Sequence, residues 1–246
     1  MPIIYLSPST QENNYFVSGG TEEDYMNRLA DAMIPYLNAS GIRYVRNTPD
    51  MTAAGAIIQS NAGDFDLHFA LHSNAAPDGK YGSVQGSIVF YYPGSFRGQR
   101  AAQIIADGLK SIYPDPNLVR SEATTSIGEV RFVRAPSVFL ELAFHDNAED
   151  AAWIKNNIPA IARNLVLSLT EYFGIPFFER QMNQSGRVDV SYGVLNIRAR
   201  PDRTSPIVAR APDEAPLSVI NRFNGWYLVK YGDTIGYVSE DYVTLY

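Results

Sequence analysis

Cysteine is absent from the 246 residues, and histidine occurs only three times. Disulfides and cysteine-based zinc sites are therefore excluded. Any transition metal has to be held by carboxylates, other oxygens and the imidazoles of His68, His72 and His145. Because so few ligand combinations exist, a metal site in this chain can be predicted in terms of individual residues.

The sequence also lacks long apolar runs and an excess of basic residues. No stretch approaches the ~18 apolar residues of a membrane helix, so we expect no membrane insertion. The net charge of -6 and the pI near 5.1 argue against a nucleic-acid partner. The first six residues lack a basic head before an apolar stretch, so we interpret them as a strand and expect no secretory signal.

Hydrophobic residues make up 46% of the chain and charged residues 19%, which is enough to build a core. Strands are expected over 3–6, 42–46, 66–72, 86–92 and 137–144. Helices are expected between Thr21 and Gly41 and over 52–61, 99–112 and 150–172. This alternation predicts an α/β fold, with a mainly parallel sheet flanked by helices.

The pattern changes after Gly174. Residues 181–187 are polar, and short strands separated by turn signals follow from Val188, with Asn224-Gly225 typical of a hairpin turn. We therefore predict a domain over 1–176, a linker over 177–187 and a small all-β barrel over 188–246.

Three motifs of this second domain resemble the bacterial SH3 domains. VLNIRARP at 194–201, NGWYLVKY at 224–231 and GYVSEDYV at 236–243 correspond to their LNVRSGPS, NGWYKVKY and GYVSSDYL. The resemblance implies an SH3-like barrel that binds cell-wall peptides or docks on its enzyme partner domain. Trp226 has a simpler interpretation as core or hairpin packing, since aromatic side chains mostly supply buried area.

Polar residues also lie at strand ends of the first domain. In open α/β sheets, ligands bind beyond the carboxyl ends of the strands, and His72 ends one strand there. Glu141 lies inside an apolar strand, where a carboxylate is unfavourable unless it is paired or functional. Glu23 lies in the first turn of a helix, a position that the helix dipole alone would favour.

These residues belong to motifs that resemble the zinc-dependent N-acetylmuramoyl-L-alanine amidases of the amidase 3 family. Glu23 and Asn27 correspond to the first two positions of an E-x-x-x-N-x-x-x-A helix, with Ala30 one residue before the place of its alanine. DLHFALHSNA at 66–75 corresponds to DLFISIHANA, and PSVFLELAFHDN at 136–147 to PAVLVELGFISN. The resemblance implies hydrolysis of the amide between N-acetylmuramic acid and L-alanine in peptidoglycan. It implies Glu23 and His72 as zinc ligands and Glu141 as the catalytic carboxylate. Asn74, just past His72, is a candidate substrate contact by its position, although a turn residue needs no such role.

One ligand of the family has no counterpart here. Its first histidine lies in a DPGHGG motif, whereas this chain reads SPSTQENN at 7–14. Three alternatives remain at this point. His145 supplies the third ligand, an oxygen of Gln11, Glu12 or Asn13 supplies it, or no proper zinc site forms. We interpret His68 as structural, because four strand residues separate it from His72 by ~13 Å.

The resulting prediction is a peptidoglycan amidase. The alternatives are a catalytically impaired domain that binds wall peptides, and a zinc peptidase of the stem peptides. The substrate places the activity at the bacterial cell wall, outside the cell. Without a visible signal, we expect either cytoplasmic synthesis with phage-type release or a host enzyme whose leader is absent from this sequence.

Overall fold

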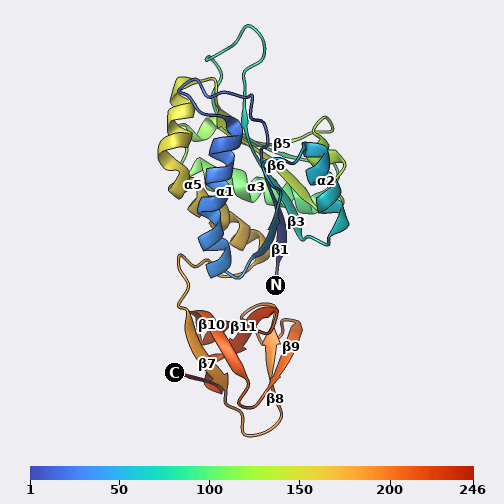
Figure 1. The fold of residues 1–246 in the computed structure, drawn as a ribbon, viewed down its shortest axis with the longest axis vertical. Coiled ribbons are helices and arrows are strands. Elements are labelled where there is room, and N and C mark those ends of the chain that lie inside the picture. The colour runs from blue at the N-terminus through green and yellow to red at the C-terminus, as the bar shows by residue number, and fades with distance from the viewer. The chain divides into compact units, whose positions relative to one another are not determined.

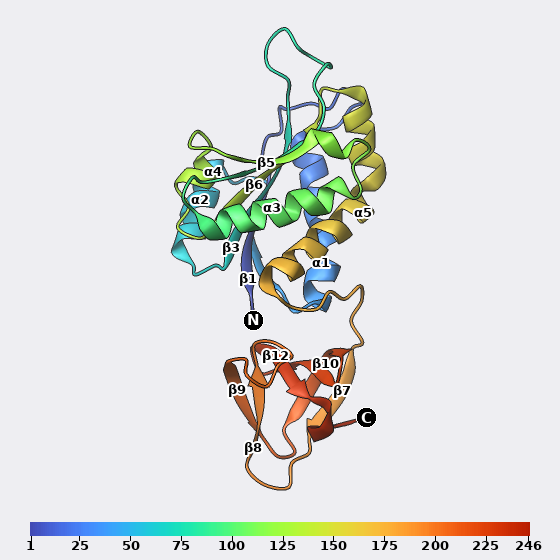
Figure 2. The ribbon, with the colours of Figure 1, turned by 180° about the vertical axis from the view of Figure 1, so that it is seen from behind.

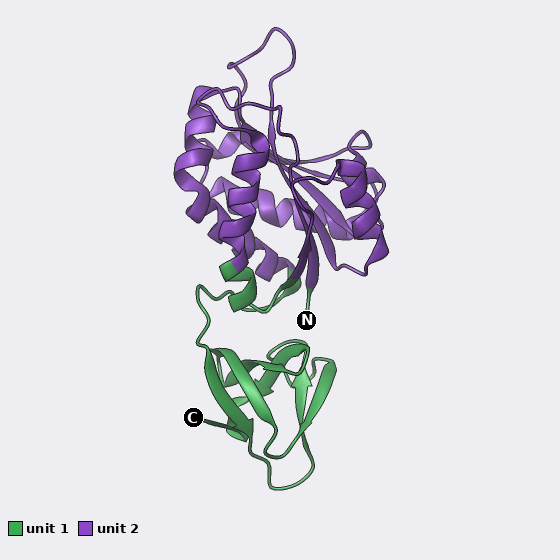
Figure 3. Ribbon diagram, in the orientation of Figure 1, with its two compact units in different colours: residues 1–2, 35–43, 173–246 green, residues 3–34, 44–172 purple.

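The computed structural model describes residues 1–246, which form two compact units (Figure 3). One unit comprises Ile3–Ile34 and Tyr44–Tyr172. The other comprises Met1–Pro2, Pro35–Arg43 and Phe173–Tyr246. None of the helices has the length and apolar character needed to cross a membrane. The domain boundaries predicted from the sequence stay a prediction.

The first unit is built on a six-stranded sheet in the order β2-β1-β3-β6-β4-β5. Parallel pairing joins β1 to β3, β3 to β6, and β4 to β5, whereas β4 runs antiparallel to β6. The predicted α/β class with a mainly parallel sheet is confirmed. The strands are β1 (Ile3–Pro8), β2 (Arg43–Arg46), β3 (Leu67–Asn74), β4 (Ser87–Tyr91), β5 (Val119–Ala123) and β6 (Ser137–Phe144).

Helices flank this sheet, with α1 and α5 on one side and α2 on the other (Figure 1). The view from behind shows α3 crossing the sheet (Figure 2), and the Asn164 side chain of α5 donates to the Gly108 carbonyl of α3 over 3.0 Å. The helices are α1 (Glu22–Ala39), α2 (Ala53–Ala62), α3 (Phe96–Lys110), α4 (Gly128–Arg131) and α5 (Ala148–Phe173), and a 3-10 turn, η1, covers Pro116–Leu118.

The central strands are buried on both faces, which explains their continuous apolar sequence. Every residue of β3 except Asn74 is buried, and in β6 only Glu141 is partly accessible. Helix α1 begins where the Thr21 hydroxyl accepts from the Asp24 backbone amide over 3.1 Å, the cap predicted for this position. Its buried face also includes a carboxylate, Glu22.

Two elements of this unit have no clear signal in the sequence. Strand β5 contains charged residues and lies at the sheet edge, and helix α4 is only four residues long. Such short or exposed elements carry too little apolar periodicity to be identified. The omission matters, because α4 holds the buried carboxylate of Glu129.

The C-terminal unit contains a seven-stranded sheet in the order β13-β7-β10-β11-β12-β8-β9. All its pairings are antiparallel, which confirms the predicted all-β SH3-like module. The strands are β7 (Gln184–Val188), β8 (Val194–Arg198), β9 (Ile207–Pro212), β10 (Pro216–Phe223), β11 (Trp226–Tyr231), β12 (Thr234–Ser239) and β13 (Val243–Leu245), with a 3-10 turn, η2, at Glu240–Tyr242.

The β10–β11 hairpin shows why the turn signal was informative. Phe223 pairs with Trp226, so the turn consists of Asn224 and Gly225, with φ of 46° and 80°. Two successive positive φ values match the twist of the flanking strands, and asparagine followed by glycine adopts them most readily. Beside this hairpin, Val219, Tyr227, Val229 and Val238 belong to one apolar core.

Candidate functional site

Two of the predicted site residues, His72 and Glu141, meet on the central strands of the sheet. His72 of β3 and Glu141 of β6 are direct neighbours in the parallel pairing of these strands. The loop after β1 and the first turn of α1 complete the surroundings of His72. The sheet thus brings together residues from four separate parts of the chain, as expected for a ligand site of this fold class.

Glu22, rather than the predicted Glu23, lies against His72. Its Oε1 is 2.8 Å from His72 Nδ1, and the Glu22 side chain is only 1% exposed. Burial raises the pKa of Glu22, but hydrogen bonds to His72 and Asn14 and the charge of His72 outweigh this and hold it below its ordinary value. Glu23 is partly exposed, and the structure does not bring it to His72.

A signal for Glu22 was available in the sequence. Glu22, Met26, Leu29 and Met33 follow helical spacing, and all four are buried on the same face of α1. Glu23 lies about 100° around the helix from that face. The motif spacing to Asn27 favoured Glu23, whereas the apolar periodicity favours Glu22.

The loop after β1 supplies polar groups instead of the missing histidine. Gln11 Nε2 lies 3.4 Å from His72 Nδ1. Asn14 Nδ2 donates to Glu22 Oε2 over 2.7 Å and to Gln11 Oε1 over 2.8 Å. Glu12 and Asn13, the other two candidates of this loop, are exposed. Of the three predicted loop residues, only Gln11 is in contact with His72.

Glu141 is a carboxylate on β6 with one oxygen that has no hydrogen-bond partner. Its side chain is partly accessible, yet Oε2 is buried without a hydrogen-bond partner. Burial raises its pKa to about 8, with the charge of His72 opposing the rise and that of Glu22 adding to it. A buried oxygen without a partner is unfavourable in a folded protein unless a ligand or water satisfies it.

Glu129 is a second carboxylate at His72 that the sequence did not reveal. Its Oε2 lies 3.4 Å from His72 Nε2, and its Oε1 lies 3.1 Å from His68 Nε2. Burial raises the pKa of Glu129, but the two imidazoles overcome this and lower it to about 2. Burial lowers the pKa of His72, while Glu129 and Glu22 raise it to about 10. His72 therefore lies between two carboxylates.

His145 lies elsewhere. Its Nδ1 is 3.0 Å from the Ser73 hydroxyl and 3.0 Å from the Ser73 carbonyl oxygen, and its ring packs near Phe16. The structure therefore does not bring its imidazole to His72. Asn74 ends β3 at the same edge, where its Oδ1 accepts from the Ala75 backbone amide over 2.9 Å. Its predicted contact with substrate stays a prediction.

The family resemblance implies a zinc ion, so the side chains around His72 can be tested as its ligands. Catalytic zinc sites use three protein ligands, and no group of three or more His, Cys, Asp or Glu side chains is arranged to hold a metal. Glu22 and His72 supply two ligands that face each other, and the Gln11 amide is the adjacent third polar group. The atom of Gln11 that faces His72 is Nε2, and Oε1 accepts from Asn14, so the donors fit zinc only if the Gln11 amide turns over and its oxygen completes the set.

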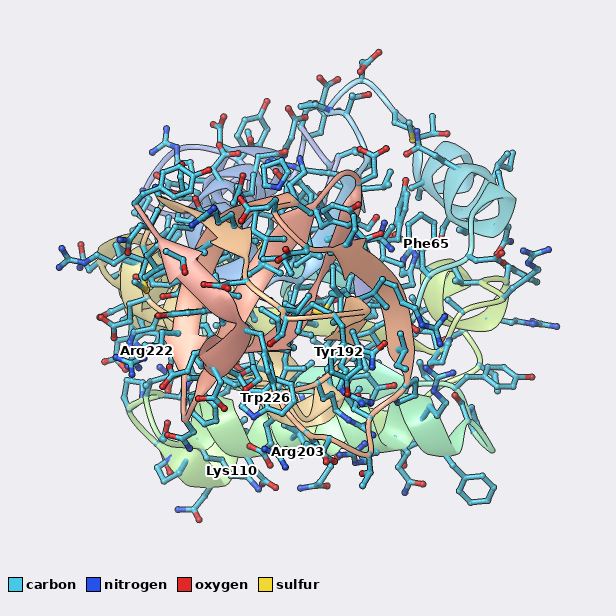
Figure 4. The ribbon with its side chains drawn as sticks, turned by 90° about the horizontal axis from the view of Figure 1, so that it is seen from below. Phe65, Lys110, Tyr192, Arg203, Arg222 and Trp226 are labelled. Atoms are coloured by element: carbon cyan, nitrogen blue, oxygen red, sulfur yellow. The ribbon has the colours of Figure 1, made fainter.

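A groove of about 510 Å³ lies on the C-terminal unit. Aromatic and basic side chains line it, including Tyr192, Trp226 and Arg203, which lie close together in Figure 4. Tyr192 is 92% exposed, far more than an aromatic residue with a packing role requires. Two arginines, Arg198 and Arg203, make the groove basic in a protein of net charge -6.

Comparison with known families supports both resemblances. Residues 9–171 match the family model described as N-acetylmuramoyl-L-alanine amidase, and residues 193–244 match the model of the bacterial SH3 domain. No curated protein sequence matches the chain. The family match includes His72, Glu22, Glu129 and Glu141.

Solved structures of similar fold include two amidases and the catalytic domain of an endolysin. The amidase AmiC2 of Nostoc punctiforme is 14% identical, with a TM-score of 0.61, over 70% of this chain and 97% of that one. The catalytic domain of CwlV from Bacillus (Paenibacillus) polymyxa var. colistinus is 13% identical, with a TM-score of 0.62, over 72% and 100%. The catalytic domain of the CD27L endolysin targeting Clostridia difficile is 20% identical, with a TM-score of 0.56, over 70% and 97%. At these identities the likeness concerns the fold.

Proposed function

We propose, since the chain belongs to the N-acetylmuramoyl-L-alanine amidase family, that it hydrolyses the amide between N-acetylmuramic acid and L-alanine in peptidoglycan. The observation that carries this proposal is Glu141. It is a partly accessible carboxylate in a buried strand, beside His72, with one oxygen that lacks a protein partner. The proposed site of action is the bacterial cell wall, the location of this substrate.

In this proposal Glu22, His72 and the amide oxygen of Gln11 hold a zinc ion. Zinc, when bound, polarises a carbonyl and makes water a stronger nucleophile. Glu141 accepts the proton of the attacking water and passes it to the departing amine of L-alanine. In the zinc-free protein burial raises the pKa of Glu141 to about 8, so this carboxyl can both hold and release a proton near neutral pH. Asn74, at the end of β3, hydrogen-bonds the substrate.

The SH3-like unit is proposed to hold the enzyme on its polymer. Tyr192 and Trp226 offer flat apolar surfaces for a peptide, while Arg198 and Arg203 attract carboxylates. The stem peptides of peptidoglycan provide such groups. We place this wall-binding module at 188–246, after a linker at 177–187 whose last residues, from Gln184, already form strand β7 of the module's sheet.

A second function is favoured by one observation. Only two side chains of the usual ligand types, Glu22 and His72, face each other at this site. The domain would therefore bind wall peptides without cutting them if Gln11 does not complete the site. Cleavage of the substrate separates this function from the first.

Purified peptidoglycan tests the proposal directly. We expect the protein to release stem peptides with a free L-alanine amine, to lose this activity in a chelator, and to regain it when zinc is added. Mass spectrometry of the products distinguishes the amidase from a stem-peptide peptidase, which leaves L-alanine attached to the sugar. Binding without product formation, at any zinc concentration, would refute the enzyme and favour the wall-binding domain.

Wall attachment is expected to depend on the groove of the C-terminal unit. Tyr192→Ala should reduce retention of the protein on insoluble peptidoglycan about 10-fold, the effect of losing ~1.4 kcal/mol at an aromatic contact. Tyr246→Ala is the matched control, because Tyr246 is also an exposed tyrosine of this unit but does not line the groove. Equal retention of the two variants would remove the groove from the proposed function.

A further inference from the structure

A buried network of polar side chains lies under His72, on the side away from Glu22. Its centre is Glu129 of α4, which is 4% exposed. Ser7 Oγ donates to Glu129 Oε1 over 2.5 Å, and the same oxygen lies 3.1 Å from His68 Nε2. The second oxygen, Oε2, lies 3.4 Å from His72 Nε2. One carboxylate therefore links β1, both histidines of β3, and α4.

His68 is fixed within this network. It is fully buried, its Nδ1 lies 2.9 Å from Ser60 Oγ, and its ring stacks on Tyr5 at 5.1 Å between centroids. Both its ring nitrogens have polar partners, so it holds Glu129 in one orientation. In the family motif quoted above, DLFISIHANA, the corresponding residue is phenylalanine. The network thus places polar and charged groups, whose removal from water is unfavourable, where the family has apolar packing.

Stability alone is a poor reason for such a network. A buried ion pair usually contributes no more than apolar side chains of the same volume, because both charges lose their hydration. The contact with His72 offers a functional reason. A metal-binding histidine commonly donates its second ring N–H to a carboxylate, which fixes the tautomer and the orientation of the ring.

The geometry around His72 matches that role. Its Nδ1 faces Glu22 and Gln11, its Nε2 faces Glu129, and Phe139 stacks on its ring at 4.1 Å between centroids. We propose that Glu129, held by His68 and Ser7, is a positioning residue that accepts a hydrogen bond from His72 Nε2–H and directs Nδ1 into the reactive site. The inference rests on the proposed function, and it adds three residues of this chain to its machinery.

Two substitutions of Glu129 test the proposal. Glu129→Ala removes the acceptor and is expected to weaken zinc binding ~10–100-fold in competition with a chelator, and to lower kcat while KM stays unchanged. Glu129→Gln keeps an oxygen that can accept from His72 Nε2, so it should restore most of both quantities. Unchanged zinc affinity and kcat in Glu129→Ala would overturn the proposal.

Asp150→Asn is the matched control. Asp150 is also buried and accepts from the backbone amides of Gly86 and Phe144 over 3.0 and 2.9 Å, but it does not contact His72. Its loss should lower the urea midpoint of unfolding while leaving the zinc affinity of the folded protein unchanged. An equal drop in zinc affinity in Asp150→Asn and Glu129→Ala would show a general loss of stability and contradict a positioning role.

Nitrogen NMR of the imidazoles separates this inference from the amidase activity. The protein has three histidines, so ¹⁵N-histidine labelling gives few signals. In zinc-free wild type we expect a slowly exchanging His72 Nε2 proton, whose signal moves and exchanges faster in Glu129→Gln and is absent in Glu129→Ala. This result is independent of zinc and cleavage. If Glu129→Ala does not fold, an unmoved signal in Glu129→Gln is sufficient to overturn the proposal.

Discussion

Glu141→Gln is expected to abolish amide cleavage, with a loss of at least about 100-fold in kcat, while zinc and peptidoglycan binding persist. Glutamine preserves the size of the side chain but cannot accept and return a proton. The measurement is the release of stem peptides from purified peptidoglycan, read beside the zinc content of each protein. Full activity of the variant would exclude Glu141 as the general acid–base.

The pH dependence of the free energy of unfolding provides the control for Glu141→Gln. The folded-state pKa of Glu141 is about 8, above its ordinary value of 4.5, so the folded protein binds this proton more tightly than the unfolded chain does. Its contribution to the free energy of unfolding in zinc-free protein is therefore lost as pH rises from about 4.5 to about 8. Glu141→Gln should lack this decline and unfold no more easily than wild type at pH 8. If Glu141→Gln is inactive because it does not fold, its inactivity does not support a catalytic role for Glu141. The cleavage assay is then made with Glu141→Asp.

The second large effect is expected at Glu22. Glu22→Gln should lower zinc affinity by more than the ~10–100-fold typical of residues that only support a ligand, and cleavage should fall with it. Glu23→Gln removes the same charge one residue away and should leave both unchanged, because Glu23 does not reach His72. Chelator competition and elemental analysis of the two variants check this. The reverse result would restore Glu23 as the ligand.

The same zinc measurement identifies the third ligand. About one zinc ion per wild-type chain is expected from a site with three protein ligands. Gln11→Ala should lose much of it, since Gln11 lies 3.4 Å from His72 Nδ1, whereas His145→Ala should keep it, since His145 contacts Ser73. Loss of zinc in His145→Ala alone would contradict this assignment.

Strongly patterned elements were predictable from the sequence. The apolar run over 137–144 coincides with β6, and the asparagine–glycine turn lies between β10 and β11 as expected. In both cases the signal is local, because a continuous apolar run or a turn that requires positive φ depends on adjacent residues. His72 and Glu141 were predicted as site residues in the same way, from short motifs that coincide with β3 and β6.

Other features depended on residues that are distant in sequence. Glu129 lies 57 positions after His72 on a four-residue helix, and nothing near it in the chain indicates that it meets two imidazoles. The choice between Glu22 and Glu23 depended on which face of α1 packs against β3, and the apolar periodicity of the helix indicates that face whereas the motif does not. Motif spacing fixes distance along the chain, not the rotation of a helix about its axis.

The sequence by itself determined the α/β class, the SH3-like second module, and the family to which the first belongs, because these follow from local patterns and short motifs. The tertiary structure alone placed Glu22 and Gln11 on one side of His72, Glu129 on the other, and His145 beside Ser73. The physical reason is that the environment of a buried imidazole is created by the packing of separate elements, and the sequence of any one element does not contain it.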